Sequence, residues 1–150
     1  MSNKDTRPDW DTYFLSIARE VGKRSTCLRR KYGAIIVKDK VIVSTGYNGA
    51  PYGKTNCIDS GVCERERLHI PKGQNYELCV AVHAEQNAII HASAEEMKDA
   101  TIYVVGINAD GTLASGAPCL LCERMIRNAR IKYGVYYIPD GSIKKVIFQP

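Results

Sequence analysis

The first stretch with a clear hydrophobic pattern follows Asp9. Its apolar residues recur every three or four positions, the spacing of one face of a helix. They are Trp10, Phe14, Ile17, Ala18 and Val21. Asp9 or Asp11 can cap the start of this helix, and Gly22 can end it. Two later stretches predict helices over about residues 83–97 and from near Pro118 toward a break at Gly134.

Short runs rich in β-branched residues predict five strands. They cover residues 33–37, 41–45, 101–105, 135–138 and 143–148. The first two form a hairpin through Asp39-Lys40. Only Pro139-Asp140-Gly141-Ser142 separates the last two, whereas a parallel crossover needs about a dozen residues or more. If the last two strands are neighbours in one sheet, they must therefore be antiparallel.

Composition indicates a globular protein. The 150 residues are long enough for one domain with a sizeable core, and residues 1–150 are expected to form it. No apolar run is long enough to span a membrane, and the polar N-terminus has no signal-peptide core, so a cytoplasmic location is expected. In that compartment the six cysteines favour metal ligation over disulfides. The net charge of +5 suits either an anionic small molecule or a nucleic acid.

Two short motifs together indicate a zinc-activated water. His83-Ala84-Glu85 precedes Pro118-Cys119-Leu120-Leu121-Cys122. Imidazole and thiolate are zinc ligands, and a catalytic zinc site keeps one of its four positions for water. A glutamate that is not itself a ligand can carry the protons. The ordered pair of motifs is typical of nucleobase deaminases, whereas a Cys-x-x-Cys alone would equally fit a redox pair.

The basic segment from Lys23 to Lys31 has two interpretations. Runs of charge are usually solvated linkers, but arginine and hydroxyl groups also bind phosphate oxygens well. Arg24-Ser25 is the most suitable pair for a phosphate. Asn48 is equally open, because it can hydrogen-bond a sugar hydroxyl or serve only as a turn residue.

Four segments resemble the zinc-dependent cytidine and deoxycytidylate deaminase family, and they are most similar to its deoxycytidylate branch. They are Arg24-Ser25 and residues 31–37, 44–51 and 83–89. The Gly-Tyr-Asn-Gly run at 46–49 is the most specific to that branch. The resemblance implies an α/β protein with a three-layer α/β/α cytidine-deaminase-like fold and a mixed five-stranded sheet.

The resemblance also implies an activity, hydrolytic removal of the 4-amino group of dCMP to give dUMP and ammonia. Family members of this branch are homo-oligomers, and many are activated by dCTP and inhibited by dTTP. Both nucleotides are therefore candidate effectors.

By the same resemblance, His83, Cys119 and Cys122 hold the catalytic zinc. Glu85 takes a proton from the attacking water and passes protons to the ring nitrogen and then to the leaving amine. Such shuttling needs a carboxyl group within hydrogen-bond reach and a pKa tuned toward neutral. The substrate-binding residues that the resemblance implies, for sugar, base and phosphate, are Asn48, Ala84, Ala117, Arg24 and Ser25.

Residues 52–78 form a long segment with little periodicity, and a loop of this length in a compact domain needs a reason. Some bacterial and phage family members carry a second, structural zinc, and Cys27 and Cys57 match two of its ligand positions. Cys63 and Cys79 complete the expected set, with His69 as the alternative for one place. The other interpretation is that these four cysteines are buried thiols.

The C-terminal half departs from the deoxycytidylate pattern. The segment from Gly106 to Ala117 is longer, and the final strands lack an intervening helix, both as in the cytidine deaminase branch. The alternative function is therefore deamination of cytidine, deoxycytidine or another amino-bearing base. A nucleic-acid editing deaminase ranks lower, because only Tyr32 lies with the basic segment to provide a stacking surface. A further alternative is a non-catalytic zinc-binding module. Glu85 argues against it, because a purely structural zinc site needs no proton carrier.

Overall fold

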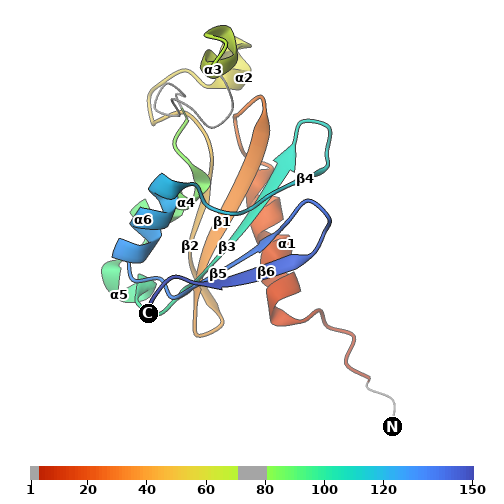
Figure 1. Cartoon of the computed structure of the whole chain (residues 1–150), viewed down its shortest axis with the longest axis vertical. Helices are drawn as coiled ribbons and strands as arrows, with labels where there is room; N and C mark the ends of the chain where they lie inside the picture. The colour runs from red at the N-terminus through yellow and green to blue at the C-terminus, as the bar shows by residue number, and fades with distance from the viewer. Residues whose placement is uncertain (1–3, 71–80) are drawn as a thin grey trace.

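A computed structural model of the chain describes residues 4–70 and 81–150 (Figure 1). Its centre is one mixed sheet with the strand order β2-β1-β3-β5-β6, and β4 pairs with β3 beside this path. The strands are β1 (Arg30–Lys38), β2 (Val41–Tyr47), β3 (Thr101–Asn108), β4 (Leu113–Ala114), β5 (Tyr133–Tyr137) and β6 (Ile143–Ile147). The helices are α1 (Trp10–Gly22), α2 (Cys57–Ser60), α3 (Glu64–Arg67), α4 (Ala84–Ile90), α5 (Ala94–Met97) and α6 (Leu120–Asn128).

The sheet lies between two helical layers, so the predicted three-layer α/β/α fold is confirmed. Helix α1 packs its buried residues Phe14, Leu15 and Ala18 against one face. Helices α4 and α6 pack on the other face through Ala84, Ala88 and Ile126. Successive residues of β1 point to opposite layers, and both layers are apolar. Its residues 33–37 therefore form a continuous buried apolar run, as expected for a strand that is covered on both faces.

The strand directions agree with the sequence pattern. Strand β1 runs antiparallel to β2 and β3, β3 runs parallel to β5, and β5 runs antiparallel to β6. The predicted antiparallel pairing of the last two strands is therefore confirmed. In the turn between them, Asp140 Oδ1 accepts a hydrogen bond of 2.7 Å from Ser142 N, and Gly141 has φ of 89°.

The elements differ from the prediction in several places. The sheet has a sixth strand, the two-residue β4, which is too short to produce a periodic signal. The predicted helix over residues 83–97 is two helices, because Ser93 caps the start of α5 by accepting a hydrogen bond from Glu96 N. Strand β1 begins at Arg30, so the end of the basic segment is strand rather than loop.

The C-terminal helix also ends earlier than predicted. Helix α6 stops at Asn128, and Gly134 lies inside β5. A Cβ at Gly134 would lie 2.6 Å from the Phe148 ring, so glycine is needed there for close packing rather than as a helix breaker. Within the described residues, none of the helices combines the length and the apolar character that crossing a membrane requires.

Candidate metal centre

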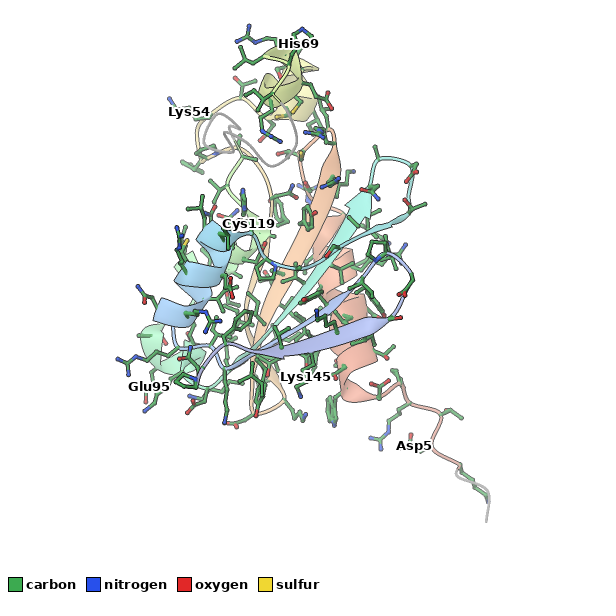
Figure 2. All side chains as sticks on the ribbon, viewed as in Figure 1. Asp5, Lys54, His69, Glu95, Cys119 and Lys145 are labelled. Carbon is green, nitrogen blue, oxygen red and sulfur yellow. The ribbon has the colours of Figure 1, made fainter. Side chains whose placement is uncertain are left out.

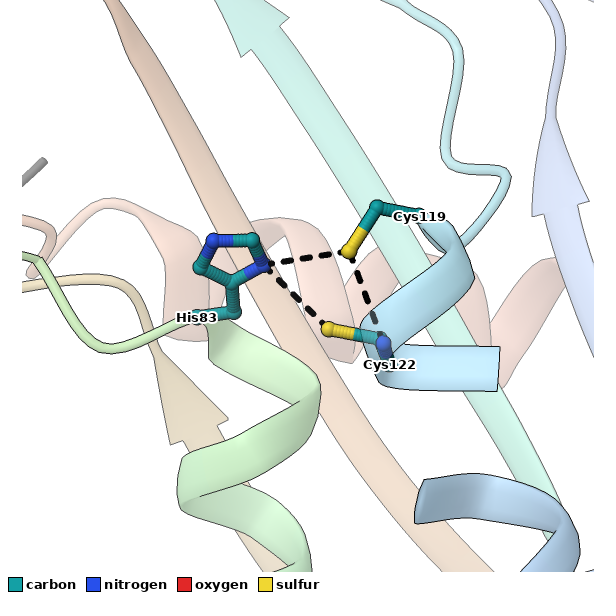
Figure 3. Close-up of side chains that lie close together, drawn as sticks. All are labelled: His83, Cys119 and Cys122. Carbon is teal, nitrogen blue, oxygen red and sulfur yellow. Dashed lines mark hydrogen bonds between the residues drawn. The ribbon is translucent and has the colours of Figure 1, made fainter. Parts of the chain in front are cut away.

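Three side chains with metal-ligand chemistry meet where the first turns of α4 and α6 approach each other (Figure 3). His83 is the N-cap of α4, Cys119 is the N-cap of α6, and Cys122 lies one turn further along α6. His83 Nδ1 lies 3.2 Å from Cys122 Sγ and 3.6 Å from Cys119 Sγ. Zinc bonds of ordinary length at a tetrahedral angle separate nitrogen and sulfur ligands by about 3.6 Å. The three atoms therefore fit a shared zinc ion.

Local hydrogen bonds fix the two chain segments that present these ligands. The Gln86 side chain accepts a 2.9 Å hydrogen bond from His83 N, which anchors the start of α4. Cys119 Sγ accepts a 3.5 Å hydrogen bond from Cys122 N, which closes the first turn of α6. These two hydrogen bonds orient both segments, and Nδ1 of the imidazole ring is directed toward the two sulfurs (Figure 3).

The electrostatics of the cluster favour a bound cation. Burial lowers the pKa of His83, so the imidazole stays neutral and able to ligate. Burial raises the pKa of the Cys122 thiol, and the nearby Glu85 and Cys119 raise it further. Negative charge is therefore unfavourable at this point without a cation, and a divalent metal ion would compensate it and hold the thiols as thiolates.

Glu85 is almost completely buried beside this cluster, with 6% of its surface exposed. Burial raises the pKa of its carboxyl group above the ordinary value. The raised pKa shifts the carboxyl group in the direction that a general acid–base group needs, because such a group must both accept and release a proton.

A cavity of about 760 Å³ opens beside the metal-ligand cluster. Glu85 lines it together with His83 and Cys119. Strand β3 ends at Asn108 on its wall, and Pro139 follows β5 there. The cavity thus lies beyond the carboxyl ends of the two parallel strands, which is where open α/β sheets bind ligands.

Three of the predicted substrate-binding residues line this cavity, namely Asn48, Ala84 and Ala117. The buried Asn48 amide also extends the sheet, because Oδ1 accepts from Tyr32 N and Nδ2 donates to Arg30 O, each at 2.9 Å. An amide group has two N–H donors and two lone pairs, so Asn48 keeps one of each for a ligand.

Arg24 and Ser25 do not line the cavity. Arg24 is exposed to solvent, and the buried Ser25 Oγ accepts a 3.2 Å hydrogen bond from Cys27 N. The cavity is lined instead by Arg29, Arg30 and Arg65, which the sequence analysis did not single out. The available signal for Arg29 and Arg30 was their place in the basic segment from Lys23 to Lys31, and Arg65 had no comparable signal.

Three of the other cysteines, Cys27, Cys57 and Cys63, lie in or near the α2–α3 segment. Cys57 and Cys63 are buried, and Cys27 and Cys63 line the cavity. Ile58 N donates to Thr26 O at 3.2 Å, which ties α2 to the chain beside Cys27. His69 lies at the outer end of this segment, far from Cys119 (Figure 2). Within the described residues, no three of these side chains bring their ligand atoms within 4.8 Å of one another, and Cys79 lies outside those residues.

Residues 8–138 match the family model of the cytidine and deoxycytidylate deaminase zinc-binding region. The chain therefore belongs to this family of zinc-binding deaminases. It is 41% identical over 137 residues to the deoxycytidylate deaminase of Mycobacterium phage D29, a match that covers 87% of this chain and 96% of the phage protein.

A second relative is the deoxycytidylate deaminase of Schizosaccharomyces pombe. The two sequences are 37% identical over 131 residues, and the match covers 87% of this chain but only 38% of the yeast protein. Among solved structures, the dCMP deaminase of cyanophage S-TIM5 in complex with dCMP and dUMP has a TM-score of 0.61 and 27% identity. That match covers 89% of this chain and 85% of the phage chain.

Proposed function

We propose that this protein is a deaminase that hydrolyses dCMP to dUMP and ammonia. The observation that carries the proposal is that buried Glu85 lines the same cavity as His83 and Cys119, two of the three metal-ligand residues. Relatives named as deoxycytidylate deaminases, and the cyanophage enzyme solved with dCMP and dUMP, support this choice of substrate.

In the proposed reaction, His83, Cys119 and Cys122 hold zinc, which when bound makes a water nucleophilic near neutral pH. Glu85 moves the protons. Its carboxylate accepts one from the attacking water and delivers it to the ring nitrogen. It then accepts the second proton of that water, from the hydroxyl group now on the ring carbon, and delivers it to the amine, which departs as ammonia. The raised pKa of Glu85 suits this role. The burial of Glu85 also excludes bulk water from the transferred proton.

The substrate lies along the wall of the cavity in this proposal. The backbone around Ala84 and Ala117 holds the pyrimidine base beside Glu85. The free N–H and lone pair of Asn48 bind the sugar hydroxyl.

We also propose a second, structural zinc on Cys27, Cys57, Cys63 and Cys79, with His69 as the alternative for one place. The burial of Cys57 and Cys63 beside Cys27 supports it, since structural zinc sites are closed and rich in thiolates. Atomic emission spectroscopy of the purified protein should find two zinc ions per chain, and Cys57→Ser should remove one of them. A single zinc ion per wild-type chain would contradict the second site.

Residues 1–150 are proposed to form a single cytoplasmic domain that assembles into a homo-oligomer, with dCTP and dTTP as candidate effectors. Light scattering coupled to size-exclusion chromatography measures the assembly. Rates of dCMP deamination measured with and without dCTP, and with and without dTTP, test whether these nucleotides regulate the enzyme.

The substrate is tested by ammonia release from dCMP, CMP, deoxycytidine and cytidine, each with and without dCTP. We expect dCMP to have the highest kcat/KM. Faster turnover of deoxycytidine than of dCMP would contradict the proposal and favour the nucleoside alternative, to which the antiparallel β5–β6 hairpin also points.

A further inference from the structure

The cavity wall carries more positive than negative charge. Among the described residues that line it, Arg29, Arg30 and Arg65 bring guanidinium groups, and Glu85 brings the one carboxyl group. Arg29 is already paired, because its Nε lies 3.1 Å from Glu66 Oε1. The partner of Arg30 is neutral, since its Nε donates a 3.1 Å hydrogen bond to Asn108 Oδ1. In the described part of the chain, no carboxylate offsets the charge of Arg30.

The turn after β3 fixes the orientation of this pair. The β1–β3 register places Arg30 opposite Asn108, although 78 positions separate them in the sequence. Asn108 Nδ2 donates to Thr112 Oγ1 at 3.2 Å, and Asn108 N donates to Thr112 O at 2.8 Å. The amide oxygen of Asn108 is thereby directed toward Arg30. With Nε engaged, the guanidinium keeps its two terminal nitrogens for a ligand, and this fork matches two oxygens of a phosphate.

The position of Arg30 relative to Asn48 also suits a nucleotide. Asn48, the proposed sugar ligand, donates through Nδ2 to the carbonyl oxygen of Arg30 itself. Both residues line the cavity that contains Glu85 and the metal-ligand cluster. A nucleotide with its base beside Glu85 and its sugar at Asn48 carries its 5′-phosphate directly beyond the sugar.

We infer that Arg30, positioned by Asn108, binds the 5′-phosphate of the substrate. The inference rests on the proposed function and makes it more specific, because it assigns recognition of a nucleotide to the wall formed by β1 and the β3–β4 turn. That turn belongs to the long segment from Gly106 to Ala117, in which the chain departs from the deoxycytidylate pattern. In this inference Arg30 takes the phosphate-binding role that the sequence suggested for Arg24, which is exposed and does not line the cavity.

The test measures binding of dUMP and of deoxyuridine, which differ only in the phosphate, by calorimetry on the zinc-loaded protein. Arg30→Gln is expected to weaken dUMP binding about 10- to 100-fold through the loss of charge-assisted hydrogen bonds. It should leave deoxyuridine binding within about twofold and raise the KM for dCMP with little change in kcat, since the phosphate is remote from the reacting ring. Asn108→Ala should shift dUMP binding and KM in the same direction by a smaller factor, because Asn108 acts only through Arg30.

Three further variants sharpen the result. Arg19→Gln changes an exposed arginine of α1 outside the cavity lining and should leave dUMP binding unaltered. Arg24→Gln separates the two phosphate assignments, since a loss of dUMP binding there but not in Arg30→Gln would overturn the inference. Arg30→Lys keeps the charge and most of the stem. If Arg30→Gln proved unfolded by circular dichroism, Arg30→Lys should still weaken dUMP binding selectively, by a smaller factor.

Equal loss of dUMP and deoxyuridine binding in Arg30→Gln, or no loss of either, would overturn the inference. Failure of the proposed function has a different signature. A wild-type protein that releases no ammonia from dCMP would refute the deaminase assignment, while the phosphate assignment would still be decided by the binding measurements.

Discussion

Gly46→Ala is expected to damage both the fold and the metal centre, because Gly46 lies where β2 contacts α4. A Cβ at this position would lie 2.4 Å from both Ala84 O and Ala88 N, which are backbone atoms. Ordinary van der Waals contact begins near 3.4 Å. The helix must therefore move away by about 1 Å, the difference between these distances. It is held in place by a 2.5 Å hydrogen bond from Ser44 Oγ to Ala88 O.

The size of the effect follows from two opposing contributions. Alanine is intrinsically more stable than glycine inside a strand by about 0.5–1 kcal/mol, so without the contact the variant would be stabilised. Overpacking against a backbone that cannot rotate away costs about 1–3 kcal/mol. The first turn of α4 carries Glu85, with His83 as its N-cap. A displacement of about 1 Å in a catalytic group lowers kcat/KM about 100-fold.

Urea unfolding, bound zinc and kcat/KM for dCMP measure these effects on one protein preparation. Gly49→Ala is the control within the same motif, because its Cβ would meet the Thr26 side chain at 2.8 Å rather than a backbone atom. We expect a smaller loss of stability in that variant. A Gly46→Ala protein that is at least as stable as wild type, with unchanged kcat/KM, would refute the reasoning.

Three other predictions concern the core and the ligands. Cys122→Ala removes one of the three ligand atoms and should lower bound zinc by one ion per chain by atomic emission spectroscopy; unchanged zinc would contradict the ligand assignment. Phe14 is only 1% exposed, so Phe14→Ala should lower the free energy of unfolding, measured in urea, by about 3–5 kcal/mol. A loss below about 1 kcal/mol would be inconsistent with the burial of Phe14. Tyr103→Phe removes the 2.9 Å hydrogen bond from Tyr103 Oη–H to Asp11 and should cost about 0.5–1.5 kcal/mol. Burial and Asp11 raise the pKa of Tyr103 in the folded protein, so this stabilisation is complete below about pH 10 and declines at higher pH. Unfolding in urea at about pH 8 and about pH 11 should show that decline in wild type and a weaker one in Tyr103→Phe, and identical pH dependence would contradict the prediction.

The sequence predicted those elements that are marked by nearby residues, such as a capping residue or apolar side chains at helical spacing. Asp9 does cap α1, since its carboxylate accepts from Thr12 N, and Phe14 and Ala18 do face the sheet. The errors arose where local polarity and tertiary packing compete with periodicity. Ser93 starts a new helix within an apolar stretch, and Gly134 permits contact with Phe148 instead of ending a helix.

The two halves of the candidate site differ in how far the sequence predicts them. The geometry brings His83, Cys119 and Cys122 together as expected, because zinc chemistry restricts the residue types and their spacing within each motif. The role of Arg30 within the basic segment was not predicted, because Arg30 meets Asn108 only through the register of β1 on β3. The prediction for Arg24 rests on side-chain chemistry and on the resemblance of a short segment, and neither contains information about which residues face the cavity.

The most direct test of the central claim is dCMP deamination by Glu85→Gln. Glutamine keeps the shape of the side chain but cannot carry a proton, and it leaves all three metal-ligand residues in place. We predict that kcat/KM falls by about 10²- to 10⁴-fold, while bound zinc and the free energy of unfolding stay close to those of wild type. Undiminished turnover by this variant would contradict the assignment of Glu85 as the proton carrier and, with it, the proposed mechanism.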